Sequence, residues 1–475
     1  MRTSKQYFEK LASMRPNVHM DGKQYDRTDP SNLGANNQAL TFDLAQDAEY
    51  RDLFTVYSPL IGEKVNRFTY PPQSVEDLLA KQEMIRTACR RTSCCIQRCT
   101  SVDMLSGMSV FTHEVDQAKG THYYDRFIEF LKYFQKNDLV GCAAHTDVKG
   151  DRSLRPHEQS DPDMYIRIVE KRKNGIVVRG AKHPIGSANF SDEILVTPCR
   201  AITKDEGDWA VAFAIPADTK GIHLIASNAN PFPRAELKAP VSLYGRGHSM
   251  VIFDDVFIPW ERVFLCGEWE FGTRAALMFA WYHRHSYTGC KPATFDHILG
   301  LVSLCAEYNG IEKAKHIQQK QADIITATEL IYAAGIAAAH KAERASSGTY
   351  IPNIVYCNVG RRHAGLAEFG LYEMLYDVAG GYPLTLPHEG DFLDPVTGPL
   401  LNKYTKRKEG IPAEHVHRLF RMICDVTCSE LATSQLAVGL HGGGSPAMEA
   451  VALVNNYDIE SRKKWTKYMA GIKED

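Results

Sequence analysis

Trp209-Ala210-Val211-Ala212-Phe213-Ala214 is a short apolar run that interrupts a sequence with mainly helical patterning. Three further runs of this kind are Ile176-Val177-Val178, Glu193-Ile194-Leu195-Val196 and Met250-Val251-Ile252-Phe253. Glycine, proline, aspartate and asparagine separate them, and apolar runs bounded by such residues are typical of β-strands. We therefore predict an α+β fold with three parts: an N-terminal helical domain at residues 1–141, a β domain at 142–269 and a C-terminal helical bundle at 270–475.

The segments on both sides of the β domain carry helix signals. Ser74 precedes Glu76 and Asp77, which is the pattern of a helix N-terminus. The apolar spacing that follows predicts a helix that continues through Ile96. Further helices are expected at residues 123–137, 322–344 and 413–440. Residues 380–410 are rich in proline and glycine and are predicted to form a loop.

The charge balance and the apolar runs narrow the classes of protein to consider. The 475 residues include 55 Lys plus Arg and 57 Asp plus Glu, so the charge gives no reason to expect a nucleic-acid partner. No run reaches the roughly 18 consecutive apolar residues of a membrane span, and no apolar run follows the N-terminus as in a signal peptide. We expect a cytoplasmic protein that acts on a small molecule and contacts neither membrane nor nucleic acid.

Twelve cysteines are many for a cytoplasmic chain, where disulfides rarely persist and clustered cysteines indicate metal or redox chemistry. On a helix, Cys95 and Cys99 would lie one turn apart on one face, with Cys94 turned away. Cys424 and Cys428 have the same spacing, but their apolar surroundings are typical of a bundle core. Spacing alone leaves open whether either pair binds a metal or only packs between helices.

Residues 281–291, with the sequence WYHRHSYTGCK, form the strongest local signal for a functional site. On a helix, one face would carry the four residues at positions i, i+4, i+7 and i+8, namely His283, Tyr287, Cys290 and Lys291. The polar residues of this segment either form a hydrogen-bonded helix face with no role in function or belong to a functional site. Joined with Cys95 and Cys99, its histidine and cysteine would suit zinc or an iron–sulfur cluster.

The segment from His145 to Arg152, HTDVKGDR, combines hydrogen-bond donors, a glycine turn and an arginine. Such a loop is either a solvated turn or a site for a flavin or a pyrophosphate. No G-x-G-x-x-G follows a predicted strand and no G-x-x-x-x-G-K-[ST] is present, so we expect neither a Rossmann nor a P-loop nucleotide site.

Longer segments spread over nearly the whole chain resemble the 4-hydroxyphenylacetate 3-monooxygenase flavoprotein family, and within it the 4-hydroxybutyryl-CoA dehydratases. The matching segments include Leu44-Ala45-Gln46-Asp47, Lys149-Gly150-Asp151-Arg152, Phe253-Asp254-Asp255-Val256-Phe257-Ile258-Pro259, Tyr282-His283-Arg284, Ala379-Gly380-Gly381 and His441-Gly442-Gly443-Gly444-Ser445-Pro446. The resemblance implies an acyl-CoA-dehydrogenase-like fold, a homotetramer or homodimer, and two cofactors, FAD and a [4Fe-4S] cluster.

The same resemblance implies where the cofactors bind. It places the cluster on four ligands: Cys95, Cys99, His283 and Cys290. It assigns FAD binding to His145, Thr146, Asp147, Lys149, Gly150, Asp151, Arg152, Gly380 and Gly381. Tyr287 and Lys291 match residues that line the dehydratase site between flavin and cluster, whereas the oxygen-using relatives carry no cluster.

The sequence departs from the dehydratase pattern at two positions. Where the dehydratases carry catalytic glutamates, this chain has His248 and Val438, and a flavin-contacting stretch reads Pro184-Ile185-Gly186. A valine cannot transfer a proton, and residues 437–440 offer no substitute, whereas His248 is able to serve as an acid–base group.

The resemblance therefore implies an FAD- and [4Fe-4S]-dependent lyase, a dehydratase with or without double-bond isomerase activity, that uses a flavin radical mechanism. The expected substrate is an acyl-CoA or a related molecule other than 4-hydroxybutyryl-CoA. The expected catalytic residues are His283, Tyr287, Lys291 and His248. Two alternatives are a flavin monooxygenase of an aromatic compound, in which the Cys/His set is structural, and a non-enzymatic cluster or flavin protein.

Overall fold

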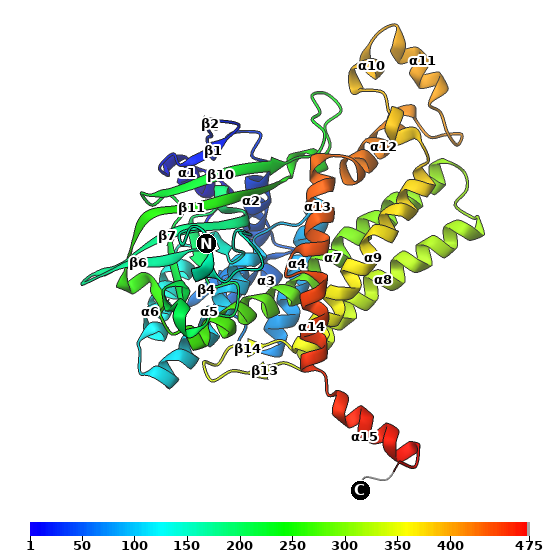
Figure 1. Ribbon diagram of the computed structural model, residues 1–475. Coiled ribbons are helices and arrows are strands. Elements are labelled where there is room, and N and C mark those ends of the chain that lie inside the picture. Colours follow the sequence, from blue (N-terminus) through cyan, green and yellow to red (C-terminus); the bar gives the residue numbers. More distant parts are fainter. Residues whose placement is uncertain (473–475) are drawn as a thin grey trace.

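The computed structural model describes residues 1–472, in which the N-terminal helices pack against a pair of larger β-sheets and also against the C-terminal helical bundle (Figure 1). The predicted α+β class is confirmed. The N-terminal helices are α1 (Ser4–Ser13), α2 (Leu33–Gln46), α3 (Arg51–Phe54), α4 (Val75–Thr92), α5 (Cys99–Lys119) and α6 (Tyr123–Lys136).

Helix α4 begins as predicted but ends early. Ser74 caps it by accepting a hydrogen bond from the Asp77 amide. The helix ends at Thr92 because the next residue, Ser93, adopts a left-handed backbone conformation with φ 56°. The expected continuation through Ile96 is wrong. Cys95 therefore lies in the loop 93–98, and the helical spacing expected for Cys95 and Cys99 is wrong as well.

Two larger sheets, apart from two short two-stranded ones, make up the β part of the molecule. The six-stranded sheet has the order β2-β1-β10-β11-β7-β6 and the four-stranded sheet the order β12-β9-β8-β5. Their strands are β1 (Val18–Met20), β2 (Lys23–Gln24), β5 (Gly141–Ala144), β6 (Arg167–Arg172), β7 (Gly175–Gly186), β8 (Glu193–Val196), β9 (Val211–Pro216), β10 (Ile222–Ala229), β11 (Arg246–Pro259) and β12 (Val263–Cys266). Three of the four predicted runs lie wholly in strands, whereas the run 209–214 enters β9 only at Val211, because Trp209 ends a 3-10 helix. The buried faces of both sheets share a core with α5 and α6.

The C-terminal part is a helical bundle. Its helices are α7 (Gly272–Tyr308), α8 (Lys315–His340), α9 (Ile354–Ala379), α10 (Glu389–Leu393), α11 (Thr397–Tyr404), α12 (Ala413–Thr427), α13 (Glu430–His441), α14 (Pro446–Asn456) and α15 (Ile459–Met469). The helix expected at 413–440 is two helices, since Ser429 caps the start of α13. The loop expected at 380–410 contains α10 and α11.

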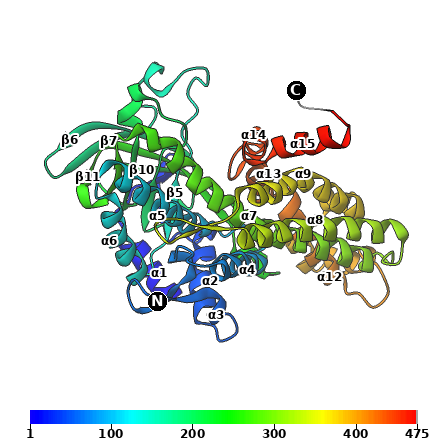
Figure 2. The same cartoon turned by 90° about the horizontal axis from the view of Figure 1, so that it is seen from below.

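Helix α7 connects the parts of the molecule, because it packs against α4 and α5 on one side and against α8 and α9 on the other (Figure 2). Helix α8 has the length and hydropathy of a membrane span. Its inner face is nevertheless buried in the bundle through Ile324, Ile331 and Ala338, as expected for a core helix.

Candidate active site

Three cysteines, two from the start of α5 and the loop before it and one from α7, lie close together. Cys95 comes from the loop 93–98, Cys99 begins α5 and Cys290 lies in the middle of α7. Hydrogen bonds from Cys290 and Cys99 hold the pKa of the Cys95 thiol well below its usual value. The same contacts with Cys95, together with burial, raise the pKa of both partners. Cys95 and Cys99 thus come together by loop geometry, where a shared helix face was expected.

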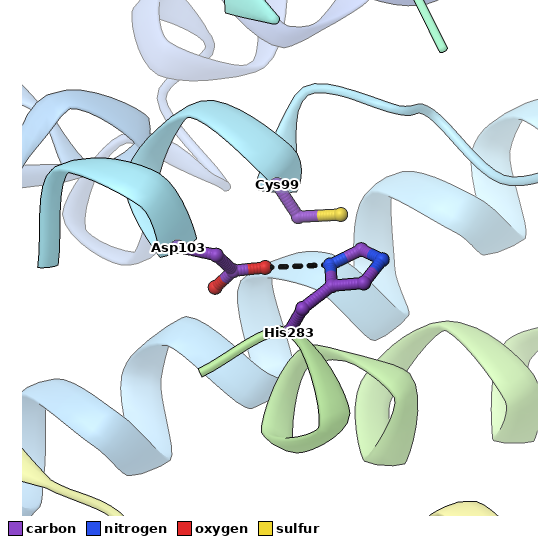
Figure 3. Close-up of side chains that lie close together, drawn as sticks. All are labelled: Cys99, Asp103 and His283. Carbon is purple, nitrogen blue, oxygen red and sulfur yellow. Dashed lines mark hydrogen bonds and ion pairs between the residues drawn. The ribbon is translucent and has the colours of Figure 1, made fainter. Parts of the chain in front are cut away.

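His283 of α7 reaches the same place and is held by Asp103 of α5. Its Nδ1 lies 2.9 Å from Asp103 Oδ2. The ligand atoms of Cys99, Asp103 and His283 all lie within 4.8 Å of one another, and Figure 3 shows the Cys99 sulfur next to the imidazole ring. Cys99 therefore lies next to both His283 and Cys95, and Cys95 in turn contacts Cys290.

Asp103 orients His283 and is unsuited to bind a metal itself. Its other oxygen, Oδ1, accepts hydrogen bonds from Lys81 Nζ at 2.5 Å and Ser286 Oγ at 2.8 Å. Burial alone would raise the pKa of Asp103, but the charge of Lys81 and the contact with His283 hold it below its usual value. With both carboxylate oxygens in use, Nδ1 of His283 is the protonated nitrogen and Nε2 is left for a ligand bond.

The other cysteine pair is divided between the bundle core, which holds Cys424, and the surface, which holds Cys428. Cys424 lies in the bundle core with its thiol directed at the Pro383 carbonyl, 3.4 Å away, and Cys428 at the end of α12 is exposed. Three thiols and an oriented imidazole in a buried position are instead the donor set of an iron–sulfur site. The convergent group on α7 fits a cluster, and the α12 pair does not.

Tyr287 and Lys291 lie one and two turns beyond His283 on α7, and both are buried. The Tyr287 hydroxyl donates to the Val438 carbonyl at 3.0 Å, and burial raises its pKa well above the usual value. Lys291 Nζ lies 2.7 Å from Glu368 Oε1 of α9. The helix predicted for residues 281–291 is confirmed. Its side chains His283, Tyr287 and Lys291 contact Asp103, Val438 and Glu368, respectively.

Residues Arg361 and Glu368 of α9 belong to this neighbourhood and were missed in the sequence. The Arg361 guanidinium lies 4.5 Å from the centre of the Tyr287 ring and donates to the carbonyls of Leu440 and Gly442. The side chains of Arg361 and Glu368 are both completely buried. Their separation of seven residues, with Asn358 three residues earlier, is a polar stripe at helical spacing, and that stripe is the signal that could have revealed them.

His248 of β11 lies beside the cysteine loop. Its Nε2 is 3.4 Å from the Gln97 amide, which also bonds to both backbone polar groups of Gly247. Burial, with a smaller effect from Arg246, lowers the pKa of His248 to about 3. The imidazole is therefore neutral near pH 7, which suits a hydrogen-bonding role better than that of a general base.

The predicted flavin loop begins next to the same site. The His145 ring packs on Phe279, which stacks on His283 with ring centres 5.2 Å apart. Burial lowers the pKa of His145 to about 3. Asp147 is held by Lys182 at 2.6 Å.

The end of the loop and the two distal glycines lie elsewhere. Gly150 adopts a positive φ of 56°, and Asp151 and Arg152 are exposed. Thr146 and Lys149 use their carbonyls to accept bonds from the His183 amide and the Tyr165 hydroxyl. Gly380 and Gly381 follow the end of α9 that points away from the sheets, so one chain does not bring them to His145 (Figure 1).

Comparison with known proteins places this geometry in a family. Residues 3–265 match the family described as 4-hydroxyphenylacetate 3-hydroxylase N terminal, and residues 273–471 match its C-terminal counterpart. The chain belongs to this family. The resemblance seen in the sequence is confirmed, and so is the acyl-CoA-dehydrogenase-like fold.

Individual relatives fall into two groups. The chain is 36% identical to the 4-hydroxybutyryl-CoA dehydratase/vinylacetyl-CoA-Delta-isomerase of Clostridium aminobutyricum over 100% of both chains. It is 28% identical to the oxygenase component of 4-hydroxyphenylacetate 3-monooxygenase from Thermus thermophilus, over 98% of this chain and 96% of the relative.

Solved structures divide in the same way. An oxygen-tolerant archaeal 4-hydroxybutyryl-CoA dehydratase from N. maritimus has a TM-score of 0.96 at 34% identity and covers 100% of this chain and 96% of its own. An oxygenase component of 4-hydroxyphenylacetate 3-monooxygenase complexed with FAD has a TM-score of 0.87 at 25% identity, with 99% and 98% covered.

Removal of single cysteines tests the ligand set. Cys95→Ala, Cys99→Ala and Cys290→Ala should each lose most of the iron from anaerobically purified protein, because each removes one thiolate from the converging group. Cys424→Ala is the matched control and should keep its iron. Iron and sulfide analysis measures both, and loss of iron from Cys424→Ala but not from Cys95→Ala would show that the assignment is wrong.

Asp103→Asn tests the orientation of His283. The amide cannot accept from His283, Lys81 and Ser286 at once, so we expect iron to be held about 10- to 100-fold more weakly, as measured by chelator competition. Asp138→Asn is the control, because Asp138 is also buried and forms an ion pair with Arg98 at 2.9 Å. Equal weakening in both variants would mean that only general stability is affected.

Proposed function

We propose that the protein is an FAD- and [4Fe-4S]-dependent lyase that eliminates a group from a small acyl thioester, with or without isomerisation of the double bond. One observation carries the proposal. Three thiols and an imidazole, the latter fixed by a buried carboxylate, converge in a chain that is 36% identical to a protein named as a dehydratase. The FAD-complexed relative supports the flavin.

The oxygenase relatives make aromatic hydroxylation the second candidate. The donor set favours the lyase, because a hydroxylase would have no use for Asp103 holding His283 with its Nε2 free beside Cys99. When bound, the flavin would supply one-electron chemistry and the cluster a Lewis-acidic iron. The cluster would be held by Cys95, Cys99, Cys290 and His283.

The surrounding residues of the chain would orient the substrate and move protons. The Tyr287 hydroxyl, one turn from His283, is placed to hold or pass a proton, because its raised pKa keeps it protonated. Lys291 supplies a positive charge for an oxygen that becomes negative. His248 is neutral and would donate a hydrogen bond to the substrate from the β11 side.

The remaining assignments concern the assembly and its location. The loop from His145 to Arg152 would hold the flavin, and Gly380 and Gly381 would contact it only if a second copy presented them. Helix α15 projects from the body (Figure 1), whereas α14 packs against α9. Both helices carry exposed apolar side chains, among them Val451, Val454, Trp465 and Tyr468. These features support a homotetramer or homodimer, and we assign the protein to the cytoplasm.

The absorption spectrum of anaerobically purified protein tests the proposal. We expect about four iron and four sulfide per chain, with non-covalently bound FAD. Protein that holds iron but never binds FAD, even after reconstitution, would exclude the proposed reaction. Protein that binds FAD without iron would favour the hydroxylase.

The substrate prediction follows from the valine at 438. A missing proton-transfer group typically lowers rates about 10²–10⁴-fold, so we expect little turnover of 4-hydroxybutyryl-CoA and preference for a thioester with a bulkier, less polar group. His248→Ala should lower activity on the preferred substrate without releasing iron or FAD. Turnover assays with cofactor analysis measure both effects. Rapid dehydration of 4-hydroxybutyryl-CoA by the wild type would contradict this reading.

A further inference from the structure

Three lysines in the described part of the chain are almost completely buried, and their hydrogen bonding differs. An ammonium group has three N–H donors. Lys182 uses all three, on the carbonyls of His145 and Thr197 and the carboxylate of Asp147. Lys81 donates to Asp103 and, at 3.3 Å, to the Tyr282 carbonyl.

Lys291 is the exception among them. Its one acceptor in the described chain is Glu368 Oε1, at 2.7 Å. Two of its donors therefore have no acceptor in the described residues, although the side chain is only 6% exposed. Leaving buried donors unpaired costs free energy, and native structures keep such groups mainly where a bound molecule or a reaction uses them.

Glu368 has little freedom to move away from Lys291. Its side chain is fully buried, and its second oxygen, Oε2, has no hydrogen-bond partner among the described residues. That oxygen packs directly on Gly439 of α13, where any side chain would collide with it. The carboxylate is thus confined between α13 and Lys291, and it determines where the ammonium lies.

A purely structural role does not explain this arrangement well. Burying two opposite charges usually stabilises a fold no better than two apolar side chains of the same size would. Among the described residues, the pair also leaves two donors and one acceptor oxygen without a hydrogen-bond partner. Its position is nevertheless next to the candidate site, since Lys291 follows Cys290 directly and lies one turn beyond Tyr287.

We propose that Glu368 is a positioning residue that fixes the Lys291 ammonium and leaves its two remaining donors for the thioester oxygen of the bound substrate. The inference rests on the proposed function. Donors fixed in advance at an oxygen that gains charge act mainly on the chemical step. Loss of Glu368 should therefore lower kcat and leave KM almost unchanged.

Glu368→Met tests the proposal, because methionine has a similar length and offers no strong acceptor. In the holoenzyme we expect kcat to fall about 100-fold, with KM within about threefold and iron and FAD contents unchanged. Glu193→Met is the matched control and should retain kcat, because Glu193 is also buried and pairs with Arg262 at 3.0 Å, on β8 and away from α7. An unchanged kcat in Glu368→Met would overturn the proposal.

Two further measurements cover the other outcomes. If Glu368→Met does not fold, the double variant Lys291→Met/Glu368→Met replaces the pair by apolar side chains, and it should fold, keep both cofactors and still lose kcat; a wild-type kcat there would overturn the proposal. A crystal structure of Glu368→Met should show Lys291 Nζ displaced, and an unmoved Nζ would also overturn it. This last measurement needs no substrate, so it decides on Glu368 even if the wild type proves inactive on thioesters.

Discussion

The buried carboxylate of Asp103 is the interaction on which the site depends. It belongs to α5, and its three donors come from α4 and α7. Burying a charge away from water costs free energy, and hydrogen bonds to the Asp103 oxygens offset that cost. The three helices must therefore keep one relative position, and that position brings His283 next to Cys99 (Figure 3). The hydrogen bonds of Asp103 therefore hold the three helices together and also fix the geometry of the site.

No single part of the fold contains the site. The loop 93–98 supplies Cys95, and the left-handed conformations of Ser93 and Gln97 give this loop its shape. The Gln97 amide then joins the loop to β11 through Gly247, beside His248. The C-terminal bundle contributes α9, whose side chains Arg361 and Glu368 contact Tyr287 and Lys291 of α7. A ligand in the site would contact all three parts, so its binding energy would stabilise their assembly.

Features with a local cause could be predicted from the sequence. The cap of α4, the helical face of α7 and four strands follow from spacing that neighbouring residues determine. The end of α4 at Thr92 could not be predicted, because a non-glycine residue in a left-handed conformation leaves no compositional signal. Asp103 and Glu368 were missed for a related reason. Each is one of several acids in its helix, and the partners that distinguish it lie between 22 and 183 residues away in the sequence.

The close approach of α13 to α9 restricts how this site is able to evolve. An alanine could enter at position 439 only after residue 368 had become smaller, since the Glu368 carboxylate occupies the space of its methyl group. By then Lys291 would already have lost its acceptor. Homologous sequences should therefore keep glycine at 439 wherever they keep glutamate at 368, and a lineage that abandons one of the two has little reason to retain the other.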